Sequence, residues 1–356
     1  MRIIIAGGGT GGHVFPAISI AQEISERNCI EEILFVGTQR GLENELLSKK
    51  GYSIKHISSR GFVGRGLFKT VGAFFYAFKG LFDSISIIRS FRPDVVLGVG
   101  GYVSGPLVLA AVLLGIPTAI CEQNTVPGVT NRILGRIVNK IFASFDSSVQ
   151  YFPSKKVLIT GNPIRKEILI NTKSSHESKS FCILVFGGSQ GAHSLNRSVP
   201  EALCRIDNKG ISVIHQTGEK DYLYVKDLYI ENEINAQVLT FIDDMAGAYD
   251  RADLVVGRAG AGTIAEITSL GKPSVLVPFP YAAHNHQLEN AKILEDAGAA
   301  VLIEDKDATP QRLALTLTKL LDKDKLQMMF ANAKKLGKPE AAREIVDEIY
   351  NLAGVN

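Results

Sequence analysis

The sequence is poor in the residues that build metal knuckles and disulfide frameworks. It has no tryptophan and only four cysteines, Cys29, Cys121, Cys182 and Cys204, which lie far apart. No C-x-x-C pair occurs, so the pattern argues against a zinc knuckle and against a redox dithiol. Because disulfides persist mainly in oxidising compartments, this cysteine pattern favours a protein of the reducing cytoplasm.

The sequence also lacks a hydrophobic run long enough to span a membrane. The segment from Val95 to Cys121 carries no charge, but glycines and prolines divide it into pieces shorter than the roughly 20 apolar residues of a spanning helix. We therefore predict a buried strand, a buried helix and a second buried strand in this segment. Residues 1–6 have strand character and run directly into glycines, so we expect no secretory signal.

Neither sign of charge is in large excess. The chain has 39 Lys and Arg against 36 Asp and Glu, a net charge of +3. This excess is too small to indicate nucleic-acid binding. Hydrophobic residues make up 46% of the 356 residues, which is a globular composition. A chain of this length exceeds one ordinary hydrophobic core, so we expect two domains.

Short β-branched runs alternate with helical stretches along the chain. The predicted strands are Arg2–Ala6, Ile33–Val36, Ile54–Ile57, Val95–Leu97, Thr118–Ile120 and Ile141–Ala143 in the first half, and Phe181–Phe186, Val213–His215, Val238–Phe241, Leu254–Val256, Ser274–Val277 and Ala300–Ile303 in the second. Helices fit between them, the first over Pro16–Arg27. Apolar strands separated by helices indicate parallel sheets covered on both faces. The expected fold class is α/β, with two doubly wound, Rossmann-like domains in tandem.

The alternation pauses at one polar run. Asn171–Ser180 contains no apolar residue and is the best candidate for a linker, although a boundary slightly upstream, near Gly161–Pro163, is also compatible. We place the boundary upstream, which gives one domain over residues 1–163 and a second over 164–340. An amphipathic helix over Glu340–Leu352, with no strand after it, dominates the remaining residues 341–356.

Three glycine loops each follow a predicted strand and precede a predicted helix. They are Gly7–His13 (GGGTGGH), Gly187–Ala192 (GGSQGA) and Gly257–Thr263 (GRAGAGT). Glycines let the backbone approach a diphosphate, and a helix N-terminus offers N–H groups and a partial positive charge. An NAD site is disfavoured, because the second strand ends without an acidic residue. Three such loops indicate phosphates or sugar hydroxyls bound at the carboxyl ends of parallel strands.

Two other interpretations of these loops remain open. Gly187-x-Ser189-x-Gly191 matches the nucleophile elbow of α/β-hydrolases, and Asp253 and His284 follow in the expected order. That interpretation gives the first glycine loop no role and requires one sheet instead of two. Separately, Thr263-x-x-Glu266 matches a helix capping box, and spacing alone favours this structural role for Glu266.

His13 is the candidate base. It lies just before a predicted helix, whose dipole disfavours a protonated ring, and a neutral imidazole can accept a proton from an attacking hydroxyl. A histidine that only hydrogen-bonds the loop is the alternative. We predict no metal: Asp305-Lys306-Asp307 has the D-x-D pattern in an apparent solvated turn, and His284-Asn285-His286 has no carboxylate or cysteine partner at ligand spacing.

One stretch is both aromatic and basic. Arg60–Phe82 (RGFVGRGLFKTVGAFFYAFKGLF) holds six phenylalanines, one tyrosine, four basic residues and no acid. This combination is typical of a membrane interface, whereas a buried crossover helix over Val71–Phe82 is the alternative. We expect Gly61–Phe68 to be a loop that faces the membrane or the acceptor. The predicted membrane-facing residues are Phe62, Val63, Leu67, Phe68 and Phe75.

Six motifs, in order along essentially the whole chain, carry a family resemblance. They are GGTGGH at 8–13, GGYVSGP at 100–106, EQN at 122–124, GNPIR at 161–165, GGSQGA at 187–192 and FIDDM at 241–245. With these motifs the sequence resembles the MurG family, the bacterial N-acetylglucosaminyltransferases of peptidoglycan synthesis. The sequence departs from the family at Cys121, where many relatives have histidine, so no acceptor role is carried over to that position.

The resemblance implies a GT-B fold, in which two Rossmann-like domains face each other across a cleft. The first domain would bind the acceptor and the membrane, the second would bind UDP-GlcNAc, and the last helix would return to the first domain. It implies inverting transfer of GlcNAc from UDP-GlcNAc to the C4 hydroxyl of the MurNAc of lipid I (undecaprenyl-pyrophosphoryl-MurNAc-pentapeptide), which gives lipid II. It implies no metal or other cofactor, and a peripheral position on the cytoplasmic face of the inner membrane. The implied partners are both substrates, an anionic membrane surface and other cell-wall synthesis proteins.

The resemblance also implies a set of site residues. Those that bind substrate are Thr10, Gly11, Gly12, Asn124, Arg165, Ser189, Ile242, Ala261, Gly262, Thr263, Ile264, Ala265, Glu266 and Gln287. The Ile242 backbone would contact uracil, Gln287 would hold the sugar, and Glu266 would hold the ribose hydroxyls, a role that replaces the cap favoured by spacing. His13 would be the base of a single displacement. An idle sugar-lipid carrier, or another GT-B transferase or epimerase of nucleotide sugars, is the alternative.

Overall fold

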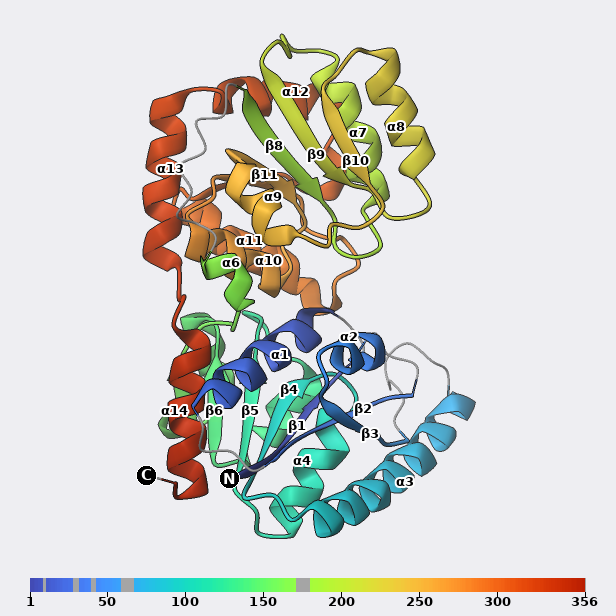
Figure 1. Ribbon diagram of the computed structural model, residues 1–356, viewed down its shortest axis with the longest axis vertical. Coiled ribbons are helices and arrows are strands. Elements are labelled where there is room, and N and C mark those ends of the chain that lie inside the picture. The colour runs from blue at the N-terminus through green and yellow to red at the C-terminus, as the bar shows by residue number, and fades with distance from the viewer. Residues whose placement is uncertain (9–10, 28–31, 40–42, 59–66, 171–179, 356) are drawn as a thin grey trace. The chain divides into compact units, whose positions relative to one another are not determined.

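The computed structural model describes residues 1–8, 11–27, 32–39, 43–58, 67–170 and 180–355, and these form two compact units (Figure 1). The first unit comprises Met1–Arg165 and Pro339–Asn356, and the second comprises Lys166–Lys338. The first unit is therefore built from both ends of the chain. The linker predicted at Asn171–Ser180 lies outside the described residues, except for Ser180.

The first unit is a seven-stranded parallel sheet with helices on both faces (Figure 1). Its strands, in the spatial order β3-β2-β1-β4-β5-β6-β7, are β3 (Ser53–His56), β2 (Glu32–Gly37), β1 (Arg2–Gly7), β4 (Val95–Gly100), β5 (Thr118–Glu122), β6 (Lys140–Ala143) and β7 (Val157–Ile159). Its helices are α1 (Gly11–Glu26), α2 (Glu43–Lys49), α3 (Leu67–Phe91), α4 (Ser104–Leu113), α5 (Val129–Leu134), η1 (Asp146–Tyr151), η2 (Ser154–Lys156) and α14 (Ala341–Ala353).

Strand β1 shows why the sheet needs cover on both faces. Its side chains alternate between two cores, as the pleat of a strand requires. Ile3 and Ile5 belong to a core shared with α1 and α14, whereas Ile4 belongs to a core shared with α3 and α4. All three are fully buried. The C-terminal helix α14 completes the first of these cores through Ile345 and its apolar neighbours.

The second unit repeats this plan with a six-stranded parallel sheet. Its strands, in the spatial order β10-β9-β8-β11-β12-β13, are β10 (Ala236–Leu239), β9 (Ile211–Gln216), β8 (Phe181–Phe186), β11 (Leu254–Gly257), β12 (Ser274–Leu276) and β13 (Ala300–Leu302). Its helices are α6 (Lys166–Ile170), α7 (His193–Leu203), α8 (Tyr222–Glu231), α9 (Met245–Arg251), α10 (Ala261–Leu270), η4 (Ala283–Asn285), α11 (His286–Asp296), η5 (Asp305–Asp307), α12 (Pro310–Leu320) and α13 (Lys323–Leu336).

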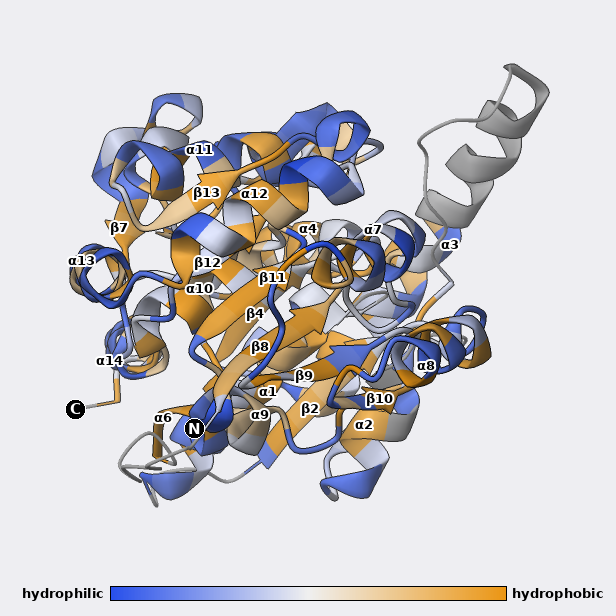
Figure 2. Ribbon diagram, turned by 90° about the horizontal axis from the view of Figure 1, so that it is seen from above, coloured by the Kyte–Doolittle hydropathy of each residue, from blue (hydrophilic) through white to orange (hydrophobic). Residues whose placement is uncertain are grey.

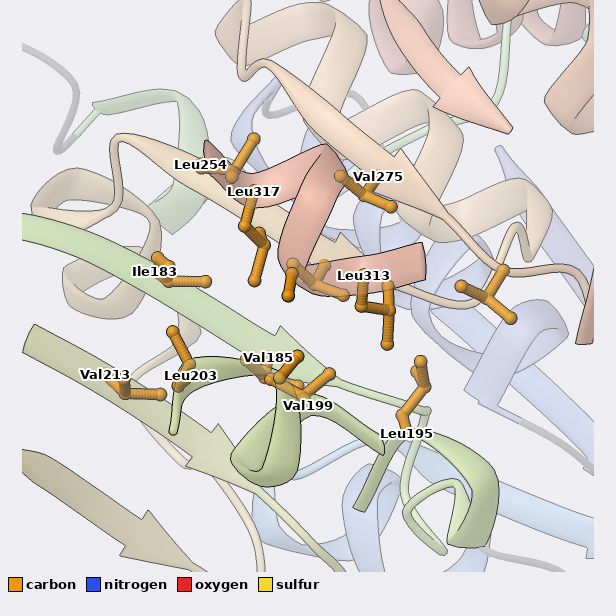
Figure 3. Packing of buried hydrophobic residues seen from close by; sticks show 14 of the residues in the cluster. Ile183, Val185, Leu195, Val199, Leu203, Val213, Leu254, Val275, Leu313 and Leu317 are labelled. Atoms are coloured by element: carbon orange, nitrogen blue, oxygen red, sulfur yellow. The ribbon is translucent and has the colours of Figure 1, made fainter. Parts of the chain in front are cut away.

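The core of the second unit shows how these helices cover the sheet (Figure 3). Val185 of β8 packs among Val199 of α7 and Leu313 and Leu317 of α12, all of them fully buried. Figure 2 shows β4, β8 and β11 as hydrophobic along most of their length. The expectation of parallel sheets covered on both faces, made from apolar strands, is therefore confirmed.

Two helix starts differ from the sequence-based expectation. Helix α1 begins at Gly11, five residues before the predicted start, so Pro16 lies inside the helix and His13 lies in its first turn. Two glycines of the predicted first loop, Gly11 and Gly12, therefore belong to the helix. Helix α3 begins at Leu67, so Leu67 and Phe68 are not in the expected loop. Among the described residues, no helix is long and apolar enough to cross a membrane.

Candidate active site

The three glycine loops lie where the connectivity of each sheet changes direction. In the first unit the chain runs outward in one direction from β1 and in the other from β4, and in the second unit it does so from β8 and β11. Ligands of open α/β sheets bind outside the carboxyl ends of the strands at such switch points. The loops directly follow β1, β8 and β11. Topology alone therefore directs attention to these two sheet edges.

In the first unit, the ring of His13 packs against the carboxyl end of β4. A Cβ atom built on Gly100 would lie 2.8 Å from His13 Nε2 and closer still to Cδ2, and Gly100 has a positive φ of 120°. A Cβ atom built on the neighbouring Gly101 would likewise clash with the backbone oxygen of Gly8. Only glycine at both positions leaves room for the imidazole and the loop, which explains the two glycines that open the GGYVSGP motif.

Ser104 fixes the ends of β1 and β4 to each other. Its hydroxyl donates to the carbonyl of Ala6 at 3.0 Å and accepts from the backbone N–H of Gly100 at 2.9 Å. Ser104 is fully buried at the start of α4. The half-buried ring of His13 therefore packs against a strand end that these hydrogen bonds hold in place.

The N-terminal turn of α1 carries a positive charge beside it. The Arg165 guanidinium lies 4.7 Å from the centroid of the Phe15 ring, and the same ring contacts Gly11. Gly12 is exposed in this turn. The first N–H groups of a helix have no intrahelical acceptor, so this turn with Arg165 suits an anion. Thr10 lies outside the described residues.

Asn124 is held by a buried carboxylate. Glu122, only 2% exposed, accepts from the Asn124 backbone N–H at 3.0 Å and from Asn131 Nδ2 at 2.8 Å. Burial raises the pKa of the Glu122 carboxyl, although these hydrogen bonds oppose the shift. Beside it, burial also raises the pKa of the Cys121 thiol. Cys121 packs in the core of the first unit and is 3% exposed.

In the second unit, every predicted site residue follows the carboxyl end of a strand in one sheet. Ser189 is exposed after β8, and the buried Ile242 comes after β10. Gln287 comes after β12, in the first turn of α11, where its Oε1 accepts from the Phe279 backbone N–H at 2.9 Å. The structure therefore brings these residues to one edge of the sheet, beside the segment that follows β11.

Helix α10 begins within the third glycine loop and contains the segment 261–266. Its residues Ala261, Gly262 and Thr263 supply the first three N–H groups, and the N–H of Ile264 is already bonded to the Gly260 carbonyl at 2.9 Å. The first three N–H groups are thus the ones that an anionic ligand can reach. Ala265 is half-buried in the next turn.

Glu266 does not form the capping box that its spacing suggests. The N-cap of α10 is Gly260 and carries no side-chain cap, so Thr263 lies inside the helix and cannot be the cap. The Glu266 carboxylate is instead 9% exposed and accepts from Tyr249 Oη at 2.9 Å. This hydrogen bond orients one carboxylate oxygen from a neighbouring helix, α9. The sequence-based preference for a cap was wrong because the helix starts three residues earlier than the motif assumes: its N-cap is Gly260 and not Thr263.

Arg258 connects the loops of this edge. Its guanidinium donates to the carbonyls of Val277 and Pro278 at 3.0 and 3.1 Å, to Asp305 Oδ1 at 2.5 Å and to Ser194 Oγ at 2.9 Å. Arg258 is 9% exposed. The carboxylate of Asp305 is therefore bound to an internal cation. The solvated turn that the sequence predicts here, in preference to a D-x-D metal site, does not describe this residue.

We expect Arg258→Met to destabilise the second unit by about 3 kcal/mol, because it leaves the largely buried Asp305 carboxylate without its cation. Urea unfolding followed by circular dichroism would measure the change. Lys306→Met is the matched control, since the Lys306–Glu304 pair is exposed and its loss should leave the unfolding midpoint nearly unchanged. Equal urea midpoints for the two variants would contradict the conclusion that Arg258 stabilises these loops.

The hydrolase interpretation is excluded by the positions of its residues. Ser189 follows the carboxyl end of β8, whereas Asp253 precedes β11 and accepts from the Cys182 N–H at the amino end of the same sheet, at 2.8 Å. Strand β8 has six residues, so about 20 Å separates the two edges. A catalytic triad needs its members in hydrogen-bond contact, and these two are a strand length apart.

Comparison with known proteins agrees with this architecture. Residues 3–143 match the glycosyltransferase family 28 N-terminal domain, and residues 182–345 match the family 28 C-terminal domain. UDP-GlcNAc 2-epimerase from Neisseria meningitidis bound to UDP-GlcNAc has the same fold, with a TM-score of 0.71 at 16% identity over 99% of this chain and all of the other. The fold and the two glycine-loop edges thus define a glycosyltransferase of the GT-B class.

The nearer relatives specify the family. Proteins named UDP-N-acetylglucosamine--N-acetylmuramyl-(pentapeptide) pyrophosphoryl-undecaprenol N-acetylglucosamine transferase are similar to this chain. The one from Myxococcus xanthus is 45% identical, covering 99% of this chain and 93% of its own length, and the one from Citrifermentans bemidjiense is 48% identical, covering 99% of both. The crystal structure of Acinetobacter baumannii MurG has a TM-score of 0.81 at 34% identity, covering 98% of this chain and 99% of the other. The chain belongs to the MurG family.

Proposed function

We propose that this protein transfers GlcNAc from UDP-GlcNAc to the C4 hydroxyl of the MurNAc of lipid I, which forms lipid II. The observation that carries the proposal is the near-complete match to relatives named for this transfer, together with glycine loops at the switch point of each sheet. The enzyme is a glycosyltransferase that uses a nucleotide sugar, as the family shows. The donor, the acceptor and the residue roles below belong to the proposal.

The donor is proposed to bind at the carboxyl edge of the second unit. The diphosphate would accept from the N–H groups of Ala261–Thr263 and from the loop around Ser189. The Glu266 carboxylate, oriented by Tyr249, would accept from the ribose hydroxyls. Uracil would contact the Ile242 backbone, and Gln287 would reach the sugar. These groups come from the four segments that follow β8, β10, β11 and β12, and all four leave the same sheet edge.

The reaction is proposed to be a single displacement with inversion. His13 takes the proton of the acceptor hydroxyl as its oxygen forms a bond to the anomeric carbon of GlcNAc. The bond from that carbon to the diphosphate oxygen breaks, and UDP leaves with the electron pair. Helix N-termini and the Arg165 guanidinium stabilise the developing negative charge, which gives the diphosphate its counter-charge without a metal ion.

Transfer of labelled GlcNAc from UDP-GlcNAc to a lipid I analogue, with purified protein and a chelator, would test this proposal. We expect a labelled lipid product. Donor binding without product would favour the idle carrier, and conversion of UDP-GlcNAc to its 2-epimer without acceptor would favour an epimerase. Product that forms only after a divalent metal is added back would contradict the metal-independent mechanism.

A membrane-facing surface on α3 is also proposed. Phe78 and Phe82 are 48% and 68% exposed, and they lie one turn apart on the same helix face. Gly80 and Ser84 point to the opposite side, because each residue advances about 100° around a helix. There a Cβ on Gly80 would meet the Ser58 oxygen at 2.6 Å and Pro106 of α4 at 3.6 Å. The apolar face of α3 at Phe78 and Phe82 therefore points outward.

Exposed Lys79 accompanies this face, and aromatic rings with cations suit an anionic membrane surface. We propose peripheral attachment at the cytoplasmic face of the inner membrane. The residues that support this proposal, Phe78, Lys79 and Phe82, differ from those that the sequence predicts to face the membrane. Phe62 and Val63 lie outside the described residues, and for Leu67, Phe68 and Phe75 only the helical backbone is described. Binding of other cell-wall synthesis proteins stays a prediction.

We expect the double variant Phe78→Ser, Phe82→Ser to bind anionic vesicles at least about tenfold more weakly, because burying a phenylalanine side chain contributes about 2 kcal/mol. Co-sedimentation with phosphatidylglycerol-containing vesicles would measure the partition. Phe330→Ser is the control, since Phe330 is similarly exposed, at 46%, on α13 of the second unit. An equal loss in the control variant, or no loss in the double variant, would rule out this face.

A further inference from the structure

The second unit contains a buried amide that joins two of the loops assigned to the donor. Gln216 is the last residue of β9 and is 4% exposed. Its Nε2 donates to the Gly188 carbonyl at 2.7 Å, and its Oε1 accepts from the Ile242 N–H at 3.2 Å. A carbonyl can only accept and an N–H can only donate, so these partners fix the orientation of the amide.

The strand order explains why a side chain is needed here. Strand β9 lies between β8 and β10, so the loop that carries Ser189 and the loop that carries Ile242 are two strands apart. Neighbouring strands lie about 4.8 Å apart, so about 10 Å separates these two loops. Backbone atoms cannot hydrogen-bond across that distance. The amide of Gln216 stands midway and bonds to both loops.

The loop on the β8 side depends on this contact for its shape. The Gly188 carbonyl also accepts from the Gly191 N–H at 2.9 Å, so it points into the loop and closes the turn. Gly188 and Gly191 have positive φ values of 88° and 73°. Gly191 packs so closely on the Thr217 carbonyl that no side chain fits. Ser189, which the proposed site uses, lies between these two glycines. Its position therefore depends on a turn that is hydrogen-bonded to Gln216.

We propose that Gln216 is a positioning residue that sets the spacing between the phosphate and base subsites of the nucleoside diphosphate. This inference rests on the proposed function. It assigns no contact with the ligand to Gln216, which acts through Gly188 and Ile242. A ligand that reaches both loops should be sensitive to Gln216, and a ligand that reaches only one loop should be much less so.

Two variants separate the two bonds of the amide. Gln216→Ala removes both. Gln216→Glu keeps the shape and an acceptor for the Ile242 N–H, but it places a carboxylate oxygen against the Gly188 carbonyl, which cannot donate. Gln237→Ala is the matched control, because Gln237 is an exposed glutamine on the adjacent strand β10, and its Oε1 accepts from Arg251. Thermal unfolding of each variant without ligand reports separately on folding.

The affinity of the 356-residue chain for UDP would be measured by titration calorimetry. Uridine, which reaches only the base subsite, would be titrated in the same way, or in competition with UDP if its binding is weak. We expect Gln216→Ala and Gln216→Glu to weaken UDP binding about tenfold or more, which corresponds to about 1.4 kcal/mol. Uridine binding should change less than about threefold, and Gln237→Ala should change neither. With UDP-GlcNAc as substrate, KM should rise in the same proportion, while kcat at saturating donor stays within about threefold.

The outcomes distinguish this inference from the function on which it rests. If the unaltered protein binds neither UDP nor UDP-GlcNAc, the proposed function fails. If the unaltered protein binds UDP and both Gln216 variants bind it equally well, only the role of Gln216 fails. Equal losses for uridine and UDP, or a fall in kcat with KM unchanged, would also overturn the role. Should Gln216→Ala not fold, the isosteric Gln216→Glu still gives the deciding result.

Discussion

Replacing His13 with alanine is expected to lower turnover by about 10²- to 10⁴-fold, the usual contribution of a positioned general base. The affinity for UDP-GlcNAc should stay within about threefold, because His13 is assigned to the acceptor proton and to no contact with the donor. Steady-state transfer to a lipid I analogue and calorimetric donor binding would measure the two effects.

His56→Ala is the control for that experiment. His56 is an exposed histidine of the same unit, and its Nε2 bonds to Asn44 Oδ1 at 2.7 Å, away from both switch-point loops. Its loss should leave turnover unchanged. Near-normal turnover by His13→Ala would show that the ring only supports the glycine loop. Glu122, a buried carboxylate at the same sheet edge, would then become the next residue to test as base.

Glu266→Gln is expected to weaken UDP-GlcNAc binding by about 10- to 100-fold, because hydrogen bonds to a charged carboxylate contribute about 1.5–3 kcal/mol. The amide retains the shape of the side chain but loses the charge and one acceptor oxygen. The variant should also discriminate less between UDP and its 2′-deoxy analogue, since the ribose hydroxyl is the proposed partner. Calorimetric titration with both nucleotides would measure affinity and discrimination together.

Two further variants make the Glu266 result interpretable. Tyr249→Phe removes the hydroxyl that orients Glu266 Oε2, and we expect a smaller loss of affinity in the same direction. Glu289→Gln is the control and should leave donor affinity unchanged. Glu289 is a half-buried glutamate on the neighbouring helix α11, and its partner is the exposed Lys292. Unchanged donor affinity in Glu266→Gln, with lowered thermal stability, would reduce Glu266 to a structural residue.

Much of the fold could be predicted because apolar strands buried on both faces have an unmistakable composition. Strand β8 was placed at Phe181–Phe186, where the structure has it, and the uncharged segment from Val95 to Cys121 does form β4, α4 and β5. Strand β7 (Val157–Ile159) was missed. It has only three half-buried residues at the sheet edge, and so short a run resembles many loops.

The helix ends were harder to predict, because glycine carries two opposite meanings. Gly11 and Gly12 were interpreted as loop residues, since glycine is a poor helix former, yet they open α1. A helix N-terminus that binds an anion needs small residues where the ligand approaches, and this requirement overrides propensity. The same effect displaced the start of α10, so a match to a capping-box pattern identified the wrong cap residue.

The supporting side chains of the site could not be predicted from spacing. Gln216 and Arg258 act on loops that are distant in sequence, so nothing near them in the chain reveals their partners. Asn124 and Asn131, the partners of Glu122, lie only 2 and 9 positions away from it, but no spacing rule identifies them. Arg258 reaches Asp305 across 47 positions, and Gln216 reaches back 28 positions to Gly188. One pattern could have helped: Glu122, Gln216 and Arg258 each lie at or just beyond the carboxyl end of an apolar strand, where ligand-binding edges are built.

The two-segment construction of the first unit also has a consequence for its synthesis. Residues 1–165 leave the ribosome first, but their core is closed by α14, which is made last. Ile345, Val346 and Ile349 are fully buried against α1 and β1, and Arg27 pairs with Asp347 at 2.5 Å. The apolar surface of α1 and β1 that α14 covers therefore stays exposed in the nascent chain until the second unit has been synthesised. The part of the enzyme that begins first is thus the part that finishes last.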